Sequence, residues 1–278
     1  MLSLLRHWII LCVTSLALLV PLQVKADDSD PSKAASEDVV FKANSDHSEQ
    51  RYVLIKPSGF DATKETPALI ALHGHGSDRW QFVKDNRAEC RAARDVAAAH
   101  GMLFVSPDYR ARTSWMGPRA ELDVVQIIED LRKQHRIGKV ILCGGSMGGT
   151  GALTFTALHP DLIAGVASLN GTANLVEYPN FLPAIAESYG GTKAEAPDEY
   201  RRRSAEFFPE KFTMPLAITT GGKDTLVPPA SALRLAEAVR KKNPNVLVIH
   251  HPDGGHSTDY DDSRKAIEYV VRLALEKK

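Results

Sequence analysis

Short apolar runs that alternate with helical patterns restrict the fold of this 278-residue chain more than any other feature. Runs with the length and composition of buried strands lie at 52–55, 68–72, 102–105, 140–143, 163–169, 216–219 and 246–249. Helical patterns lie at 121–135, directly after residue 146, near 230–241 and at 262–276. Continuous apolar strands between helices are typical of a mostly parallel sheet covered on both faces. The sequence therefore predicts an α/β fold whose ligands bind at the carboxyl ends of the strands.

Two segments depart from this alternation. Residues 27–50 are polar and acidic, so we expect a flexible lead-in with little core of its own. Residues 172–212 are less regular and more polar than the rest, and we expect a cap or a long excursion over the sheet. The folded domain is thus expected to span 51–278.

Residues 1–26 have the pattern of a secretory signal peptide. Arg6 and His7 precede an apolar run at 8–20, and the triplet at 24–26 places small residues where a signal peptidase cleaves. The run is shorter than the roughly 20 residues of a membrane-spanning helix, although a retained anchor is the alternative. We therefore expect a secreted or periplasmic protein with no stable membrane anchor after cleavage.

Charge and cysteine content argue against several classes of protein. The 34 basic and 34 acidic side chains balance, whereas nucleic-acid-binding proteins carry a basic surface, so no nucleic-acid partner is expected. Cys90 and Cys143 remain after signal removal, and the chain has no C-x-x-C pair of the kind found in zinc ribbons. Cys143 ends an apolar run, which favours a buried free thiol and leaves a bond to Cys90 as the alternative.

The segment Gly144-Gly145-Ser146-Met147-Gly148-Gly149 contains the pattern G-x-S-x-G between a predicted strand and a predicted helix. This context is that of a nucleophile elbow, a sharp turn in which the neighbours of the serine must be small. Such a turn exposes the Ser146 hydroxyl and points a helix N-terminus at developing negative charge. A Gly-rich phosphate loop is the alternative, but it requires a lysine that this segment lacks. Ser146 is therefore the predicted nucleophile.

A serine hydroxyl is a weak nucleophile until a base removes its proton, and His256 is the predicted base. His256 lies in a glycine-flanked loop between the last predicted strand and the last predicted helix. Other histidines lie at strand ends, at helix ends or in the lead-in, where they fit this role less well.

The base in turn needs an acid that fixes its tautomer, and Asp224 is the predicted acid. Asp224 lies just beyond the predicted strand at 216–219, and the order Ser146, Asp224, His256 is the one found with nucleophile elbows. Asp253 is nearer to His256 in sequence, but the two share one short loop and need not face each other. A turn or helix N-cap is the alternative role for Asp224.

The segment Leu72-His73-Gly74-His75-Gly76-Ser77-Asp78 follows another predicted strand. Glycines in such a loop let backbone amides approach a substrate carbonyl oxygen. We assign the oxyanion hole to the backbone N–H groups of Met147 and His75, with Gly76 as the alternative to His75.

The segments LHGHGSD, GGSMGG, GGKDTLVPP and GGHST resemble those of the α/β-hydrolase superfamily. Within it they are similar to secreted esterases of the feruloyl-esterase and polyester-depolymerase type and to prolyl-oligopeptidase catalytic domains. The resemblance covers about residues 50–278. It implies an eight-stranded, mostly parallel sheet, a Ser-His-Asp triad, and neither a metal nor an organic cofactor. The chain is too short for the β-propeller of a prolyl oligopeptidase, so cleavage of large proteins is not expected.

Two other classes of function compete with this interpretation. His73, His75 and Asp78 form H-x-H-x-x-D at a strand end, superficially like a metallo-hydrolase, but a serine and an arginine occupy the neighbouring positions where further ligands would stand. A non-catalytic binding protein on a hydrolase scaffold is the second alternative, against which the intact Ser, His and Asp argue.

The sequence thus predicts a serine hydrolase that cleaves carboxylic esters, with a small-peptide hydrolase of the prolyl-oligopeptidase type as the alternative. The expected partner is a small-molecule or glycan-linked ester. Aromatic and basic residues after the strands suit a phenolic or carbohydrate-linked ester, with packing and solvation as their other explanation. These residues are Trp80, Arg110, Arg112, Trp115 and Tyr178.

Overall fold

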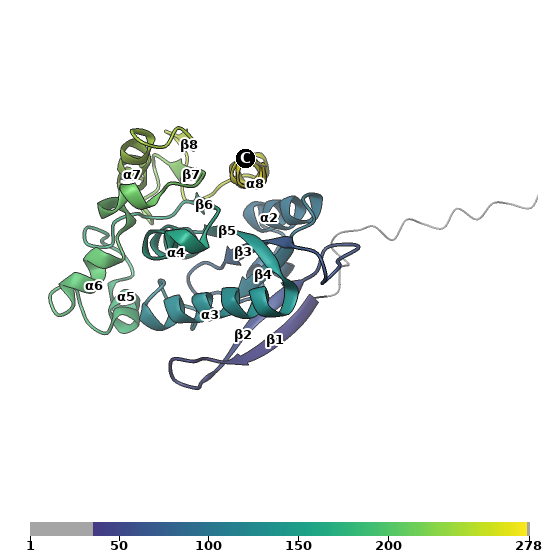
Figure 1. Ribbon diagram of the computed structural model, residues 1–278. Helices are drawn as coiled ribbons and strands as arrows, with labels where there is room; N and C mark the ends of the chain where they lie inside the picture. The colour runs from purple at the N-terminus through teal and green to yellow at the C-terminus, as the bar shows by residue number, and fades with distance from the viewer. Residues whose placement is uncertain (1–35, 277–278) are drawn as a thin grey trace, which may run out of the picture. The chain divides into compact units, whose positions relative to one another are not determined.

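The computed structural model describes residues 36–276, in which eight strands form one sheet (Figure 1). Their order is β1-β2-β4-β3-β5-β6-β7-β8, with antiparallel pairing of β1 to β2 and of β2 to β4 and parallel pairing across the rest. The strands are β1 (Ser36–Lys42), β2 (Glu49–Ile55), β3 (Thr66–Leu72), β4 (Leu103–Pro107), β5 (Ile137–Gly145), β6 (Gly165–Leu169), β7 (Leu216–Gly221) and β8 (Val246–His251). This is the predicted α/β-hydrolase architecture.

Helices cover both faces of the sheet and enclose two separate apolar cores. One core contains buried residues of α3, α4 and α7, and the other contains those of α2 and α8 (Figure 1). The helices are α1 (Gln81–Lys84), α2 (Ala88–Ala99), α3 (Pro118–His135), α4 (Met147–Leu158), α5 (Leu182–Tyr189), α6 (Pro197–Arg202), α7 (Ala230–Arg240) and α8 (Tyr260–Leu275). None of the helices within residues 36–276 is long and apolar enough to cross a membrane.

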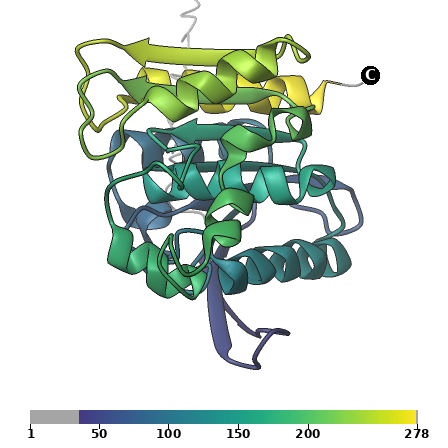
Figure 2. The ribbon, with the colours of Figure 1, turned by 90° about the vertical axis from the view of Figure 1, so that its left-hand side faces the viewer.

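The expected lead-in at 27–50 is wrong for its second half, because β1 and the start of β2 lie there. β1 pairs with β2 along its whole length, from Ser36 opposite Ile55 to Lys42 opposite Glu49. The polar composition of β1 does not indicate a strand, because an edge strand held by backbone hydrogen bonds needs few apolar side chains. Of β1, Val39 and Phe41 pack on the core. The β1–β2 hairpin projects beyond the helices in Figure 2. The expected signal peptide lies outside the described residues.

The irregular segment 172–212 contains α5, α6 and two short 3₁₀ turns, and a buried arginine ties it to the rest of the fold. Arg203 has no exposed side-chain surface and donates hydrogen bonds to Glu121 Oε2 (2.7 Å) and to the carbonyl oxygen of Met116 (2.7 Å). Burial alone would raise the pKa of Glu121, but bonds to His159 and Arg203 outweigh burial and lower this pKa to about 2.

We expect Glu121→Gln to lower the free energy of unfolding by about 3 kcal/mol, because it removes one of the two carboxylates, Glu121 and Glu199, that pair with the buried Arg203 charge. The pKa of Glu121 lies below its ordinary value of 4.5, so its stabilisation is complete above pH 4.5 and is lost as pH falls toward 2. Urea unfolding at pH 7 and at acid pH measures both effects. Glu129→Gln, at an exposed site on the same helix, is the control. Equal stabilities of the two variants at pH 7 would contradict this account.

The two cysteines of the described region are buried free thiols. Burial raises the pKa of Cys90 to about 12 and that of Cys143 still further, so neither is a thiolate at neutral pH. The expectation of a buried free thiol at Cys143 is confirmed.

Candidate active site

Ser146 lies in the turn between β5 and α4, with φ 57° and ψ −118°. This left-handed conformation is strained for a residue with a side chain and persists only where the surroundings enforce it. Close packing enforces it here: a Cβ on Gly148 would lie 1.9 Å from the carbonyl oxygen of Leu72. The Ser146 N–H also donates to the carbonyl oxygen of Leu169 on the neighbouring strand (2.8 Å). The predicted nucleophile elbow is therefore present.

The structure brings the three predicted triad residues into one hydrogen-bonded chain. Ser146 Oγ lies 3.0 Å from His256 Nε2, and His256 Nδ1 lies 2.6 Å from Asp224 Oδ2. The carboxylate can only accept, so Nδ1 carries the proton and Nε2 is left to accept the serine proton. The other Asp224 oxygen accepts from the backbone N–H groups of Leu226 (2.9 Å) and Val227 (2.8 Å).

Burial and orientation distinguish Asp224 from Asp253. The Asp224 side chain is 1% exposed and faces His256, whereas Asp253 is 89% exposed and forms an ion pair with Lys223. A buried carboxylate holds an imidazolium in a medium of lower dielectric constant, where their attraction is stronger. Asp224 therefore has the position that a triad acid requires.

The candidate oxyanion donors differ in whether their backbone N–H groups already donate a hydrogen bond within the fold. The Gly76 N–H donates to the carbonyl oxygen of Arg112 (2.8 Å), and the Gly74 N–H donates to Gln81 Oε1 (2.7 Å). Within residues 36–276 the N–H groups of His75 and Met147 have no such acceptor. An oxyanion hole needs donors that are not already engaged. This favours His75 over Gly76 and agrees with the choice of Met147.

The side chains of the H-x-H-x-x-D segment have partners inside the fold. The two ring nitrogens of His73 face the carbonyl oxygens of Gly74 (2.9 Å) and Asp108 (3.2 Å). Asp78 Oδ1 accepts from the backbone N–H of Trp80 (2.9 Å). The His75 ring instead packs against the aromatic rings of Trp115 and Phe181. Among the described residues no group of three or more His, Cys, Asp or Glu side chains is arranged to hold a metal ion.

The His75 ring belongs to an aromatic flank formed by His75, Trp115, Tyr178 and Phe181. Its centroid lies 4.4 Å from that of Phe181, and Nδ1 accepts a hydrogen bond from the Trp115 indole (3.1 Å). Burial lowers the pKa of His75, which keeps the ring neutral and able to accept that bond. Sequence reasoning named Trp115 and Tyr178 but missed Phe181, which is separated from β3 by more than a hundred residues.

Two of the other substrate-contact candidates are engaged within the fold. Arg110 forms ion pairs with Asp46 (2.9 Å) and with Asp123 (2.8 Å). The Lys84 ammonium lies over the Trp80 ring, 3.7 Å from its centroid. These contacts agree with a structural role for Arg110 and Trp80.

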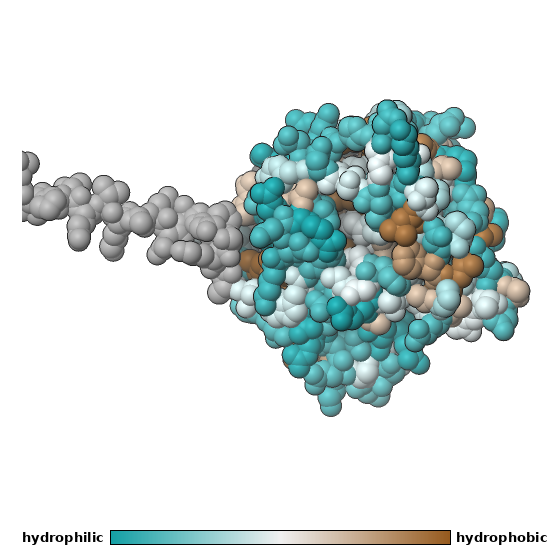
Figure 3. All heavy atoms as spheres, turned by 180° about the vertical axis from the view of Figure 1, so that it is seen from behind, coloured by the Kyte–Doolittle hydropathy of each residue, from teal (hydrophilic) through white to brown (hydrophobic). Residues whose placement is uncertain are grey.

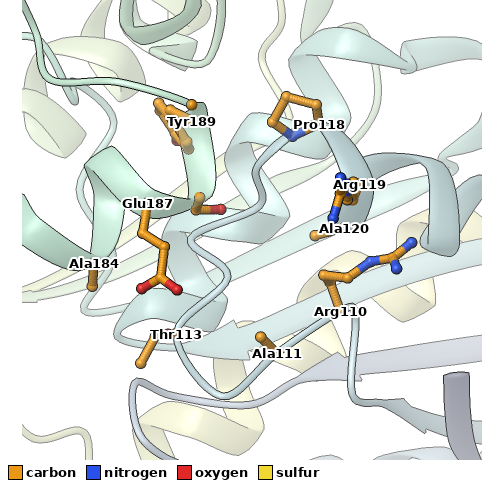
Figure 4. A pocket seen from close by; sticks show the side chains of 11 residues that line it. Arg110, Ala111, Thr113, Pro118, Arg119, Ala120, Ala184, Glu187 and Tyr189 are labelled. Atoms are coloured by element: carbon orange, nitrogen blue, oxygen red, sulfur yellow. The ribbon is translucent and has the colours of Figure 1, made fainter. Parts of the chain in front are cut away.

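Two cavities lie near this part of the fold. One, of about 280 Å³, is lined by Ser146 and His256 together with residues from α2 and β6. A larger one, of about 440 Å³, lies between the 110–120 loop and α5 and contains no triad residue; Glu187 is on its wall (Figure 4). The face opposite that of Figure 1 is mostly hydrophilic, with a group of apolar residues on it (Figure 3).

Comparison with known proteins identifies the family. A model of the prolyl oligopeptidase family matches residues 95–275. Dipeptidyl aminopeptidase BIII from Pseudoxanthomonas mexicana is 27% identical over 142 residues, which cover 48% of this chain and 21% of that protein. This chain thus spans about a fifth of the length of that relative.

Solved structures show the same fold at low sequence identity. Puromycin hydrolase has a TM-score of 0.70 and 20% identity, covering 89% of this chain and 40% of its own. A ferulic acid esterase has a TM-score of 0.65 and 17% identity, covering 86% of this chain and 98% of its own. With the family model matched over more than half of the chain, the protein is a serine hydrolase with an α/β-hydrolase domain and belongs to the prolyl oligopeptidase family.

Proposed function

We propose that the protein hydrolyses short peptides through an acyl-enzyme on Ser146. The observation that carries the chemistry is the chain of hydrogen bonds from Ser146 through His256 to Asp224. Peptides are favoured as substrates because the family model is that of prolyl oligopeptidases and one curated relative is a dipeptidyl aminopeptidase. The expectation of an ester as the main substrate therefore becomes the second candidate.

The mechanism follows from which atoms face one another. His256 Nε2 accepts the Ser146 proton as Oγ attacks the substrate carbonyl carbon, and Asp224 stabilises the imidazolium that forms. The N–H groups of His75 and Met147 bind the oxygen on which negative charge develops. His256 then protonates the leaving group, and it later activates the water that hydrolyses the acyl-enzyme. Neither a metal nor an organic cofactor takes part.

Carboxylic esters are the second candidate, and a specific observation favours them. The ferulic acid esterase has this fold, and this chain spans 98% of its length, whereas it spans a fifth of the dipeptidyl aminopeptidase. The aromatic flank at His75 and Phe181 suits a phenolic or carbohydrate-linked ester. Export from the cytoplasm and a small-molecule substrate are also parts of the proposal.

Turnover of residues 27–278 against four substrates tests these candidates: a dipeptidyl anilide, a proline-containing peptide anilide, an aryl acetate and a ferulate ester. We expect the peptide anilides to be cleaved with the higher kcat/KM. Higher kcat/KM on the ferulate ester would overturn the first candidate in favour of the second.

Removal of divalent metal ions is expected to leave turnover unchanged, because every step is assigned to protein groups. Dialysis against a chelator, followed by assay on the best of the four substrates, measures this. Loss of activity that returns with a divalent metal ion would contradict the mechanism.

A further inference from the structure

The cavity of about 280 Å³ beside the triad differs in its lining from the aromatic flank at His75. Several polar side chains line it, and the start of α2 brings both a basic and an acidic residue to it. The residues that bear on its chemistry are Gln81, Arg87, Glu89, Asn170, Ser257 and Thr258. Leu169, one of its apolar wall residues, belongs to the core under α2 and α8, whereas Trp115 and Tyr178 belong to the core on the other face.

This placement decides which part of a substrate enters the cavity. The leaving group must lie next to His256, because Nε2 gives it the proton taken from Ser146. His256 and the two residues after it line the cavity. The acyl part then lies toward the aromatic flank, and the leaving group lies in this cavity.

Asn170 is the unusual residue of this cavity. It follows the last residue of β6, is 7% exposed, and its Oδ1 atom has no hydrogen-bond partner in the described part of the chain. A buried polar atom without a hydrogen-bond partner destabilises the fold. The backbone adds strain, since φ is 51°, in the left-handed region. The fold itself compensates neither cost, but a bound substrate in the cavity can supply the missing hydrogen bonds.

Ser168, a second residue nearby with an unpartnered side-chain oxygen, does not share these features. Ser168 Oγ is also without a partner, but it lies against Gly149 and Gly171, where a Cβ on either glycine would be within about 3 Å of it. It does not line the cavity. Of these two orphaned side chains, only Asn170 borders the space in which a leaving group would lie.

We propose that this cavity is the leaving-group subsite and that the Asn170 amide binds the amide group of an amino-acid or peptide leaving group. A side-chain amide offers both a donor and an acceptor, which match the C=O and N–H of a peptide unit. An apolar alcohol offers neither. This inference rests on the proposed function and narrows its substrates to those with a carboxamide on the leaving side.

Acyl transfer to an added amine measures this subsite directly, since the amine binds where the leaving group departs. The amine nitrogen attacks the carbonyl carbon of the Ser146 acyl-enzyme, and the bond from that carbon to Oγ breaks. His256 accepts a proton from the nitrogen and returns one to Oγ, giving an amide and the free enzyme. Amide and free acid form from the same acyl-enzyme. Their ratio therefore does not depend on how fast a variant forms that acyl-enzyme.

The acetyl donor is an aryl acetate, and the two amines are glycinamide and glycine methyl ester. Glycinamide has amide N–H donors, which glycine methyl ester lacks. We expect wild type to transfer acetyl to glycinamide about tenfold more efficiently than to the methyl ester, the effect of one hydrogen bond. Asn170→Gly removes the side-chain amide while accepting the left-handed backbone, and it should abolish this preference. Glu187→Gln, on the separate cavity of Figure 4, should retain it.

The outcomes separate the two proposals. If Asn170→Gly keeps the tenfold preference, Asn170 serves the backbone conformation alone and the subsite assignment is overturned. Equal transfer to both amines by wild type overturns it as well. Absence of any acetyl-enzyme in wild type overturns the proposed function and removes the basis of this inference.

Discussion

Replacement of Ser146 by alanine should lower kcat by about 10⁵-fold or more, the scale found when the serine of such a triad is removed. The reason is that the attacking Oγ is lost, and no other hydroxyl lies within hydrogen-bond distance of His256 Nε2 in residues 36–276. Steady-state turnover of the best substrate measures the effect. The fold should be retained, because alanine is smaller than serine and the backbone N–H still donates to Leu169.

Thermal unfolding is the control for Ser146→Ala, and we expect its Tm to lie within a few degrees of wild type. A variant with native Tm and near wild-type kcat would show that Ser146 is not the nucleophile. In that case the geometry would describe a binding protein on a hydrolase scaffold.

Replacement of Asp224 by asparagine should lower kcat by about 10⁴-fold with little change in KM. The asparagine oxygen can still accept from the N–H groups of Leu226 and Val227, so the loop is expected to remain. Its NH₂ group would then face His256 Nδ1 and favour the tautomer with the proton on Nε2. That tautomer cannot accept the Ser146 proton.

Asp253→Asn is the matched control, because it changes the other aspartate of the same region, which is exposed and faces Lys223. We expect its kcat to stay within about twofold of wild type, as for most exposed substitutions. A larger loss for Asp253→Asn than for Asp224→Asn would reassign the triad acid.

The parallel part of the sheet could be predicted because its strands are buried on both faces. Residues 140–143 of β5 and 216–218 of β7 are continuous runs of buried apolar residues, and this composition indicates a strand. β1 could not be predicted, since it is an edge strand whose stability comes from its ladder with β2. α2 was also missed, because six of its twelve residues are alanines, whose small side chains give a weak apolar stripe.

The triad was predictable for a different reason. Glycine is required at positions 144 and 148, where a Cβ would lie 2.5 Å and 1.9 Å from neighbouring backbone atoms, so the sequence carries the geometry of the turn. His256 and Asp224 follow strand ends, and parallel strands bring those ends to one edge. The aromatic flank and the cavity beside the triad were not predictable, because they join segments whose contact depends on the tertiary fold, such as Phe181 against His75.

The most direct test of the central claim is labelling with a fluorophosphonate, which reacts with an activated serine, followed by mass analysis of the peptides. We predict one label per chain, on Ser146, and loss of labelling in Asp224→Asn because His256 can then no longer activate the hydroxyl. Labelling of another residue, or no labelling of folded wild-type protein, would contradict the account.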